Sequence, residues 1–469
     1  MTDPNADLAL GGLTLDEAER EIYSHILSRN PEHDFDPKIS RVREAVELLG
    51  DPQRAFKVIH LTGTNGKTST ARMVESLVRE HGLRTGLFTS PHLSSVRERI
   101  QIDGEPIAQD EFVRLWRDVA PIIHMVDARS AEKDGPRLSF FEVLTVLAYA
   151  AFADAPIDVA VIEVGMGGAW DATNVADGDV SVITRVALDH QQWLGDDLAG
   201  IALEKSGIIK PHATAVIAEQ SESVAPVLIK AAAEREARAL WEGDDMEVVD
   251  RQPGVGGQLV TLRTPAARYE ELFVPLYGEY QAHNALLAVV AVESLLADGG
   301  PLSALNGETL EAGFAAVTSP GRLEAVRTSP MILVDAAHNP AGIDALVGAI
   351  EESFAFEALV GVVGILSDKD AEGILAGLEP LLDEVVLTAS ASARAIPVDE
   401  LAEIAEKLFG EDRVRRSESL PDALDQAVQL AEAEHDMGAG VLVVGSVTVI
   451  AEARVLLGAD NRKGTGRAR

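Results

Sequence analysis

Three features of the sequence predict an α/β protein with two domains. Apolar runs typical of buried strands alternate with helix-like patterns along most of the chain, and this alternation indicates a doubly wound, mostly parallel sheet. The alternation stops near residue 248 and starts again near residue 332. The chain has 469 residues, too many for one ordinary hydrophobic core. We therefore expect an N-terminal domain over residues 1–318 and a smaller C-terminal α/β domain over residues 319–469.

The first stretch of alternation should form the larger sheet. Asp36-Pro37 precedes an amphipathic pattern that Gly50 closes, which predicts a capped helix. Strands are expected at 56–62, 85–89, 157–164, 180–185 and 213–218, and helices at 68–81, 109–124, 139–153, 199–207 and 224–239. Parallel strands end at the same edge of a sheet, and ligands bind at that edge.

The segment that follows has a different pattern. Residues 248–276 contain short alternating runs and several glycines, which predicts a few antiparallel strands, and a long helix is expected at 281–297. The turn-forming stretch Ser319-Pro320-Gly321 suits a hinge. Strands at 332–335, 360–366, 385–388 and 441–444 then predict the second α/β domain.

The composition excludes several classes of function. The formal net charge is −36 and there are no cysteines, so we expect no nucleic-acid partner, no disulfide and no thiolate metal site. No apolar run reaches the roughly 18–20 residues of a membrane helix, and the N-terminus lacks the basic region of a signal peptide. We therefore expect a cytoplasmic protein without a membrane partner. Any anionic ligand must bind through local positive groups and a divalent cation.

A glycine-rich turn between the strand at 56–62 and the helix at 68–81 predicts a phosphate-binding loop. Its glycines let several backbone N–H groups point at one phosphate, and the helix N-terminus adds its dipole. Lys67 supplies charge for the outer phosphates, and the Thr68 hydroxyl can reach them or a metal ion. The usual loop spacing fails, because Leu61 occupies the first glycine position. A chance turn is the alternative, which the flanking elements disfavour. The loop residues are Gly63, Thr64, Asn65, Gly66, Lys67, Thr68 and Ser69.

Further segments place hard metal ligands near strand ends. Ser90 and Glu163 each follow an apolar strand, and His190 lies just past another. An oxygen ligand, a carboxylate and an imidazole suit one or two magnesium ions that bridge ATP phosphates. Each residue alone has an ordinary alternative, since His190 can be a core or surface histidine and Glu163 can cap the following turn. Together with the phosphate loop they favour a metal site.

The motifs, taken in order, resemble those of folylpolyglutamate synthases in the Mur ligase superfamily, and they look closest to the actinobacterial bifunctional dihydrofolate synthase/folylpolyglutamate synthases. The resemblance covers nearly the whole chain. It implies a P-loop ATPase-like N-terminal domain and a Rossmann-like glutamate-ligase domain. The matching motifs are the phosphate loop, Ser90-Pro91-His92, Glu163-Val-Gly-Met-Gly-Gly168, Asp171-Ala-Thr-Asn174, Asp189-His190, Glu204-Lys205, Pro320-Gly-Arg-Leu-Glu324, Asp335-Ala-Ala-His338-Asn339-Pro340 and Asp368-Lys369-Asp370.

The resemblance implies a ligase that adds L-glutamate to dihydropteroate and to reduced folates at the expense of ATP. The acceptor carboxylate would form an acyl phosphate, and the amino group of glutamate would then expel phosphate. Two magnesium ions would be bound, the first by Ser90 and Glu163 and the second by His190 and Lys205. Lys205 would be carbamylated by carbon dioxide. The partners would be these small molecules, and we expect a monomer.

The resemblance also assigns the remaining roles. The catalytic residues would be Lys67, Lys205, His190, Arg322 and His338. Beyond the loop, ATP would contact Asn284, Arg322, Asp335 and His338. The folate pocket would contain Phe35, Arg41, Ser139, Phe141, Glu142 and Asp171, and candidates for the glutamate pocket are Ser446 and Arg454. Three positions depart from common family residues, outside the loop and the proposed metal ligands: Ala169, Tyr280 and Ala393.

Other classes share part of this pattern. A peptidoglycan Mur ligase would carry a nucleotide-sugar domain before the phosphate loop, for which about 55 residues are too few. A regulatory or mechanical P-loop ATPase would not need the motif around Lys205. A non-enzymatic folate-binding relative would not need four residues that are intact here: Lys67, Glu163, His190 and Lys205. An enzyme with polyglutamate synthase activity alone is a further alternative.

Overall fold

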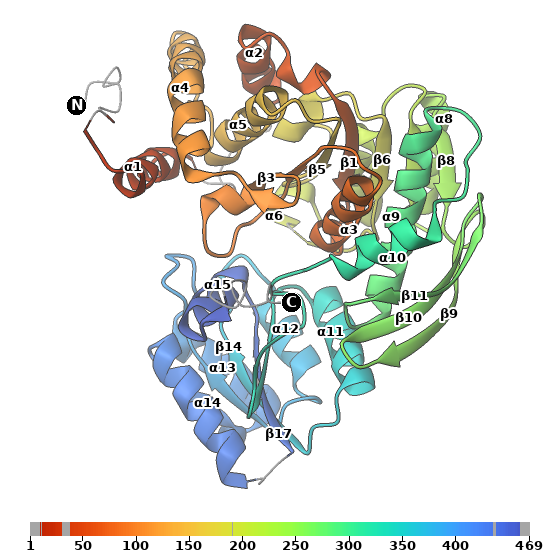
Figure 1. Ribbon diagram of the computed structural model, residues 1–469. Helices are drawn as coiled ribbons and strands as arrows, with labels where there is room; N and C mark the ends of the chain where they lie inside the picture. Colours follow the sequence, from red (N-terminus) through yellow and green to blue (C-terminus); the bar gives the residue numbers. More distant parts are fainter. Residues whose placement is uncertain (1–9, 11, 31–37, 190, 435–437, 460–469) are drawn as a thin grey trace, which may run out of the picture.

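The structure, a computed structural model, describes residues 10, 12–30, 38–189, 191–434 and 438–459 (Figure 1). Phe35 and His190, expected to contact folate and metal, lie outside the described residues. The described chain contains an eight-stranded sheet, a three-stranded sheet and a six-stranded sheet. The six-stranded sheet and its helices lie below the larger sheet in Figure 1, and the three-stranded sheet, in green, lies at the side.

The eight-stranded sheet is parallel except at one edge, where β3 and β4 are antiparallel. Its central strands β5, β1 and β6 are almost wholly buried, because helices cover both faces of the sheet. This confirms the expected doubly wound architecture. In spatial order the strands are β4 (Glu105–Pro106), β3 (Ile100–Ile102), β2 (Thr85–Phe88), β5 (Val159–Glu163), β1 (Lys57–Thr62), β6 (Val180–Ile183), β7 (Thr214–Ile217) and β8 (Arg238–Trp241).

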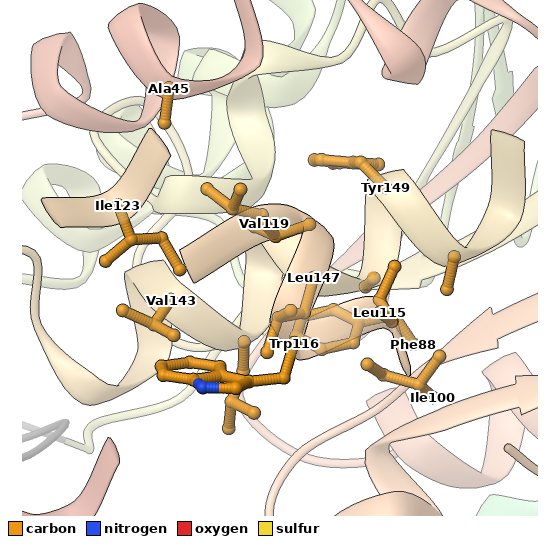
Figure 2. Packing of buried hydrophobic residues seen from close by; sticks show 14 of the residues in the cluster. Ala45, Phe88, Ile100, Leu115, Trp116, Val119, Ile123, Val143, Leu147 and Tyr149 are labelled. Atoms are coloured by element: carbon orange, nitrogen blue, oxygen red, sulfur yellow. The ribbon is translucent and has the colours of Figure 1, made fainter. Parts of the chain in front are cut away.

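Alternate residues of β5 sort into the two faces of the sheet. Val159 and Val161 belong to an apolar cluster with α3 (Lys67–Glu80), α9 (Glu279–Ala297) and α10 (Gly307–Ala315). Ala160 and Ile162 belong to a cluster on the other face, part of which Figure 2 shows around Trp116. The helices of that face are α1 (Leu15–Leu27), α2 (Ser40–Leu48), α4 (Gln109–Ala131) and α5 (Phe140–Asp154).

Smaller elements complete this part of the chain. The pattern at 248–276 predicted a few antiparallel strands, and the structure confirms them. They form a sheet of order β11-β10-β9 that packs on α9. Its strands are β9 (Glu247–Gly254), β10 (Gly257–Arg263) and β11 (Arg268–Val274). The remaining helices here are α6 (Gln191–Leu194), α7 (Leu198–Lys205) and α8 (Ala225–Glu234).

The six-stranded sheet is also mostly parallel, with antiparallel β12 at one edge. Two apolar clusters cover it, one with α11 (Pro340–Ser353), α12 (Ala371–Leu378) and α13 (Val398–Phe409), the other with α14 (Leu420–Glu434) and α15 (Val447–Leu456). In spatial order the strands are β12 (Glu324–Thr328), β13 (Met331–Asp335), β17 (Ala439–Val444), β14 (Ala358–Val363), β15 (Glu384–Leu387) and β16 (Val414–Arg416).

The prediction of a helix over 224–239 is wrong at its C-terminal end, because α8 stops at Glu234. The chain leaves α8 after Glu234, turns through Glu236 at φ +52°, and forms β8 beside β7. Leu240 is the buried residue of that strand. The sequence also did not reveal α1, α10, β3, β4, β12 or β16. None of the helices in the described ranges is long and apolar enough to cross a membrane.

Candidate active site

A cleft of ≈ 1890 Å³ lies where the parallel strands of the larger sheet end and face the N-terminus of α11. It collects side chains from loops after β1, β2, β5 and β6 and from the loop after β13. Most of the site residues expected from the sequence line it. They are Thr64, Asn65, Gly66, Lys67, Thr68, Ser69, Ser90, Ser139, Phe141, Glu142, Glu163, Asp171, Asn284, Arg322, Asp335, His338 and Ser446.

Four expected residues within the described ranges do not line the cleft. Gly63 and Lys205 border a small adjoining cavity of ≈ 10 Å³. Arg41 is buried behind Glu142. Arg454 is buried and pairs with Glu324, so the structure does not support its place in a glutamate pocket.

The phosphate loop is shaped by two glycines in the left-handed region. Gly63 has φ +146°, and a Cβ there would lie 1.8 Å from Thr184 Oγ1. Gly66 has φ +86° and precedes α3, and a Cβ there would lie 2.6 Å from Asn284 Oδ1. Only glycine fits both positions without displacing a neighbour. The expected adenine contact Asn284 therefore lies directly against the loop.

Lys67 folds over this loop. Its Nζ donates to the carbonyl oxygens of Gly63, at 3.2 Å, and Thr64, at 3.0 Å. Burial lowers the pKa of Lys67, and the charge of Glu163 is the main opposing influence. The ammonium group thus lies against the loop, and Lys67 lines the cleft.

Glu163 is a buried carboxylate at the end of β5. Its Oε1 accepts a hydrogen bond of 2.9 Å from Thr68 Oγ1, and its Oε2 accepts one of 3.3 Å from the backbone N–H of Ser90. Burial raises the pKa of Glu163, and the charge of Lys67 opposes that shift. A carboxylate and two hydroxyl-bearing residues therefore meet beside the phosphate loop.

Lys205 lies beneath the loop at 4% exposure. Its Nζ donates to the Gly63 carbonyl oxygen at 2.8 Å. Burial, reinforced by the charge of Lys67, lowers the pKa of Lys205 to about 7. A substantial fraction of this amine is therefore uncharged near neutral pH.

Asp189, next to the expected ligand His190, connects the two larger sheets. Its carboxylate accepts from Lys369 Nζ at 2.7 Å and from Asn339 Nδ2 at 3.1 Å, and it lies 3.4 Å from His338 Nε2. Asn339 also exchanges amide hydrogen bonds of 3.2 Å with Asn65 of the phosphate loop. Sequence reasoning gave no role to Asn339 or Lys369, although both stand in motifs of the resemblance.

Asp335 and Arg322 approach the cleft from the six-stranded sheet. The Asp335 carboxylate accepts from the N–H groups of Leu323, at 2.6 Å, and Ala337, at 2.7 Å, so it fixes the loop after β13. Burial raises the pKa of Asp335, and Arg322 is the strongest opposing charge. Arg322 itself lines the cleft, and its positive charge acts to lower the pKa of Glu163.

The residues expected to bind folate form one wall of the cleft. Ser139 and Glu142 make a capping box at the start of α5, and Arg41 donates to Glu142 at 3.0 Å. Phe141 packs against Phe88, with ring centroids 5.6 Å apart. Burial raises the pKa of Asp171 to about 6, and hydrogen bonds from backbone N–H groups and a hydroxyl oppose the shift.

The second metal ligand set cannot be assembled from the described residues. They contain no group of three or more His, Cys, Asp or Glu side chains arranged to hold a metal ion. Ser90 and Glu163 are adjacent through a hydrogen bond. His190 lies outside the described ranges, and an unmodified lysine offers no oxygen ligand to a hard cation such as magnesium.

The packing of Leu93 ties the loop after β2 to the other sheet. Leu93 contacts the apolar cluster of the six-stranded sheet that includes Ile450 of α15. Its backbone N–H donates to Glu98 at 2.9 Å. The loop that carries Ser90 is therefore anchored on both sides of the cleft.

This fold and site define an ATP-dependent ligase built from Mur ligase domains. The family model of the Mur ligase middle domain matches residues 115–292, and that of the Mur ligase glutamate ligase domain matches residues 321–447. A dihydrofolate synthase/folylpolyglutamate synthase of Mycobacterium tuberculosis is 47% identical over 455 residues, which covers 93% of each chain. The chain belongs to the dihydrofolate synthase/folylpolyglutamate synthase family.

Further comparisons agree with this assignment. The Bacillus subtilis protein of the same name is 30% identical over 426 residues, covering 89% of this chain and 94% of the relative. Among solved structures, a Mycobacterium tuberculosis folylpolyglutamate synthase complexed with ADP and AMPPCP matches with a TM-score of 0.90 and 45% identity. That match covers 95% of this chain and 99% of the other.

Proposed function

We propose that this chain adds L-glutamate to dihydropteroate and to reduced folates, with ATP as the source of energy. The observation that carries this proposal is the single cleft in which the phosphate loop, the buried Glu163 carboxylate and Arg322 from the opposite sheet converge. A wall with Phe141 and Asp171 borders the same cleft and provides a place for the acceptor. The names of the relatives support both acceptors.

The reaction proceeds in two steps. The acceptor carboxylate oxygen attacks the γ-phosphorus of ATP, and the bond to ADP breaks, which leaves an acyl phosphate. The amino nitrogen of glutamate then attacks the acyl carbon, loses a proton and expels inorganic phosphate. The protein contributes charge and alignment. Lys67 neutralises the outer phosphates, and Arg322 and His338 approach the nucleotide from the six-stranded sheet.

Magnesium fits the residues beside the phosphate loop. A buried carboxylate with a raised pKa, here beside the Thr68 hydroxyl, is the environment in which a hard divalent cation replaces a proton. We assign the first ion to Ser90 and Glu163 and the second to His190 and Lys205. When bound, these ions neutralise phosphate charge and help to align the transferred group.

Carbamylation of Lys205 would supply the ligand that the second ion lacks. An uncharged Nζ attacks the carbon of carbon dioxide and loses a proton, and the product carries one negative charge on two oxygens. The lowered pKa of Lys205 and its burial support this chemistry, because only the neutral amine reacts.

The acceptor pocket uses residues with two different tasks. Phe141 and Asp171 line the cleft and are suited to contact the acceptor. Arg41, Ser139 and Glu142 bond mainly to one another, so we assign Arg41 to the support of the wall. Phe35, which was also expected in this pocket, lies outside the described ranges.

We also propose a division into domains at 1–318 and 319–469, which close over the substrates during turnover. The polar contacts of Asp189 and Asn65 with the second part support such closure, since a few hydrogen bonds are easily exchanged. The relatives act on small molecules, and we propose that this chain does so as a cytoplasmic monomer.

Release of phosphate tests the proposal directly. Purified protein is incubated with magnesium and ATP, and with glutamate and either dihydropteroate or a reduced folate. We expect phosphate release only when ATP, glutamate and an acceptor are all present. Hydrolysis of ATP with neither glutamate nor acceptor would indicate a generic ATPase. Activity with reduced folates alone would leave only the polyglutamate synthase function.

A further inference from the structure

A chain of hydrogen bonds runs from the interior of the larger sheet to the cleft. His60 is in β1 and has 0% exposure. Its Nε2 lies 2.8 Å from Thr173 Oγ1, in the 3-10 helix Ala172–Val175. Thr173 Oγ1 in turn donates to Asp171 Oδ1 at 2.5 Å. Asp171 lines the cleft, whereas His60 and Thr173 do not. None of the roles assigned above uses His60 or Thr173.

The direction of these hydrogen bonds follows from the protons available. A carboxylate only accepts, so the single hydroxyl proton of Thr173 is directed to Asp171. The Thr173 oxygen must then accept from His60, which places the imidazole proton on Nε2. Nδ1 has no hydrogen-bond partner, as expected for a bare lone pair. Burial lowers the pKa of His60 to about 3, so the ring stays neutral.

Other contacts hold Thr173 and Asp171 in place. The backbone N–H of Thr173 donates to Asp171 Oδ1 at 2.9 Å, and its carbonyl oxygen accepts from Tyr149 at 2.6 Å. The backbone N–H of Met166 donates to Asp171 Oδ2 at 3.0 Å. The backbone N–H of Gly165 interacts with the same carboxylate. These contacts fix the orientation of Asp171, which lines the cleft.

We propose that His60 is a positioning residue for the acceptor: through Thr173 it keeps Asp171 oriented as a carboxylate that accepts an N–H from the acceptor's heterocycle. This inference rests on the proposed function, because it takes the cleft wall to be the acceptor site. It specifies the chemical class recognised there, a ring that presents N–H donors. ATP and glutamate bind elsewhere in the cleft and do not depend on this chain of bonds.

Matched substitutions distinguish the loss of a hydrogen bond from a change in side-chain volume. Thr173→Val removes the hydroxyl at nearly constant shape, and Thr173→Ser keeps it. His60→Leu removes the N–H, and His60→Gln keeps an N–H group near the position of Nε2. For each variant we would measure kcat, the melting temperature, and KM for dihydropteroate, ATP and glutamate.

We expect Thr173→Val and His60→Leu to raise KM for the acceptor by about tenfold or more, the effect of a lost hydrogen bond to a charged group. KM for ATP should stay within about twofold, and Thr173→Ser and His60→Gln should restore most of the acceptor affinity. The double variant His60→Leu/Thr173→Val should be no worse than Thr173→Val alone, because both changes break one chain.

The possible failures are distinguishable. If the wild-type protein turns over no pterin acceptor, the proposed function fails and this inference falls with it. If the wild type is active but Thr173→Val leaves the acceptor KM unchanged, only the inference is wrong. A parallel rise in KM for ATP, or additive effects in the double variant, would also overturn it, since either result indicates a general structural role.

Discussion

Replacing Lys67 by alanine tests how much the phosphate loop contributes to phosphoryl transfer. The Lys67 ammonium group donates to the carbonyl oxygens of Gly63 and Thr64, and Lys67 lines the cleft, so water can replace the ammonium group there. The loss of stability should therefore be about 1 kcal/mol or less. Its effect on the transition state is larger. A preoriented charge near the transferred group contributes about 100-fold to 1000-fold in kcat, or roughly 2.7–4 kcal/mol.

The assay follows phosphate release at saturating ATP, glutamate and acceptor, with the melting temperature measured in parallel. Lys57→Ala is the matched control, because Lys57 begins the strand that leads into the phosphate loop but pairs with Asp298 at the surface. We expect Lys57→Ala to retain full activity and Lys67→Ala to lose at least 100-fold in kcat. If Lys67→Ala keeps more than about a tenth of wild-type kcat, roughly 1.4 kcal/mol of barrier, then Lys67 does not act on the transferred phosphate.

Four further outcomes are expected. Arg41→Met should lower the unfolding free energy by about 3–5 kcal/mol, because it leaves the buried Glu142 carboxylate without its partner; adding Glu142→Gln should recover part of this loss in chemical denaturation. Gly63→Ala should abolish nucleotide binding in calorimetry, since its Cβ would lie 1.8 Å from Thr184 Oγ1. The acceptor KM should rise as pH falls below about 6, where Asp171 takes up a proton. The folded-state pKa of Asp171 is raised, so protonation favours the folded state, and circular dichroism should show no unfolding from this group. Chelation of magnesium should stop phosphate release, and added magnesium should restore it.

Much of the site was predictable because short sequence motifs determine its local geometry. The phosphate loop requires glycine at two positions with positive φ, and the lysine follows directly at the helix start. Ser90 and Glu163 end neighbouring parallel strands, so strand order alone brings them together. The same reasoning located the antiparallel segment and the second α/β unit.

The unpredicted contacts join residues that are far apart in sequence. Asn65 and Asn339 are 274 positions apart, and Asp189 and Lys369 are 180 apart. Nothing in local periodicity reveals such pairs. His60 looked like part of an apolar strand, and its hydrogen bond to Thr173 depends on how the 3-10 helix packs on β1. The strand β8 was missed because its short apolar pattern also fits a helix.

The anchoring of Leu93 has a consequence for the order in which ligands leave. Ser90 lies in the same loop as Leu93. If the two sheets separate, either Leu93 loses contact with its apolar neighbours or Ser90 moves away from Glu163. Exposing a partly buried leucine costs about 1 kcal/mol. This biases the protein toward the closed form by roughly fivefold. A cation held by Ser90 and Glu163 would therefore be thermodynamically linked to the separation of the two sheets, because the same loop makes both contacts.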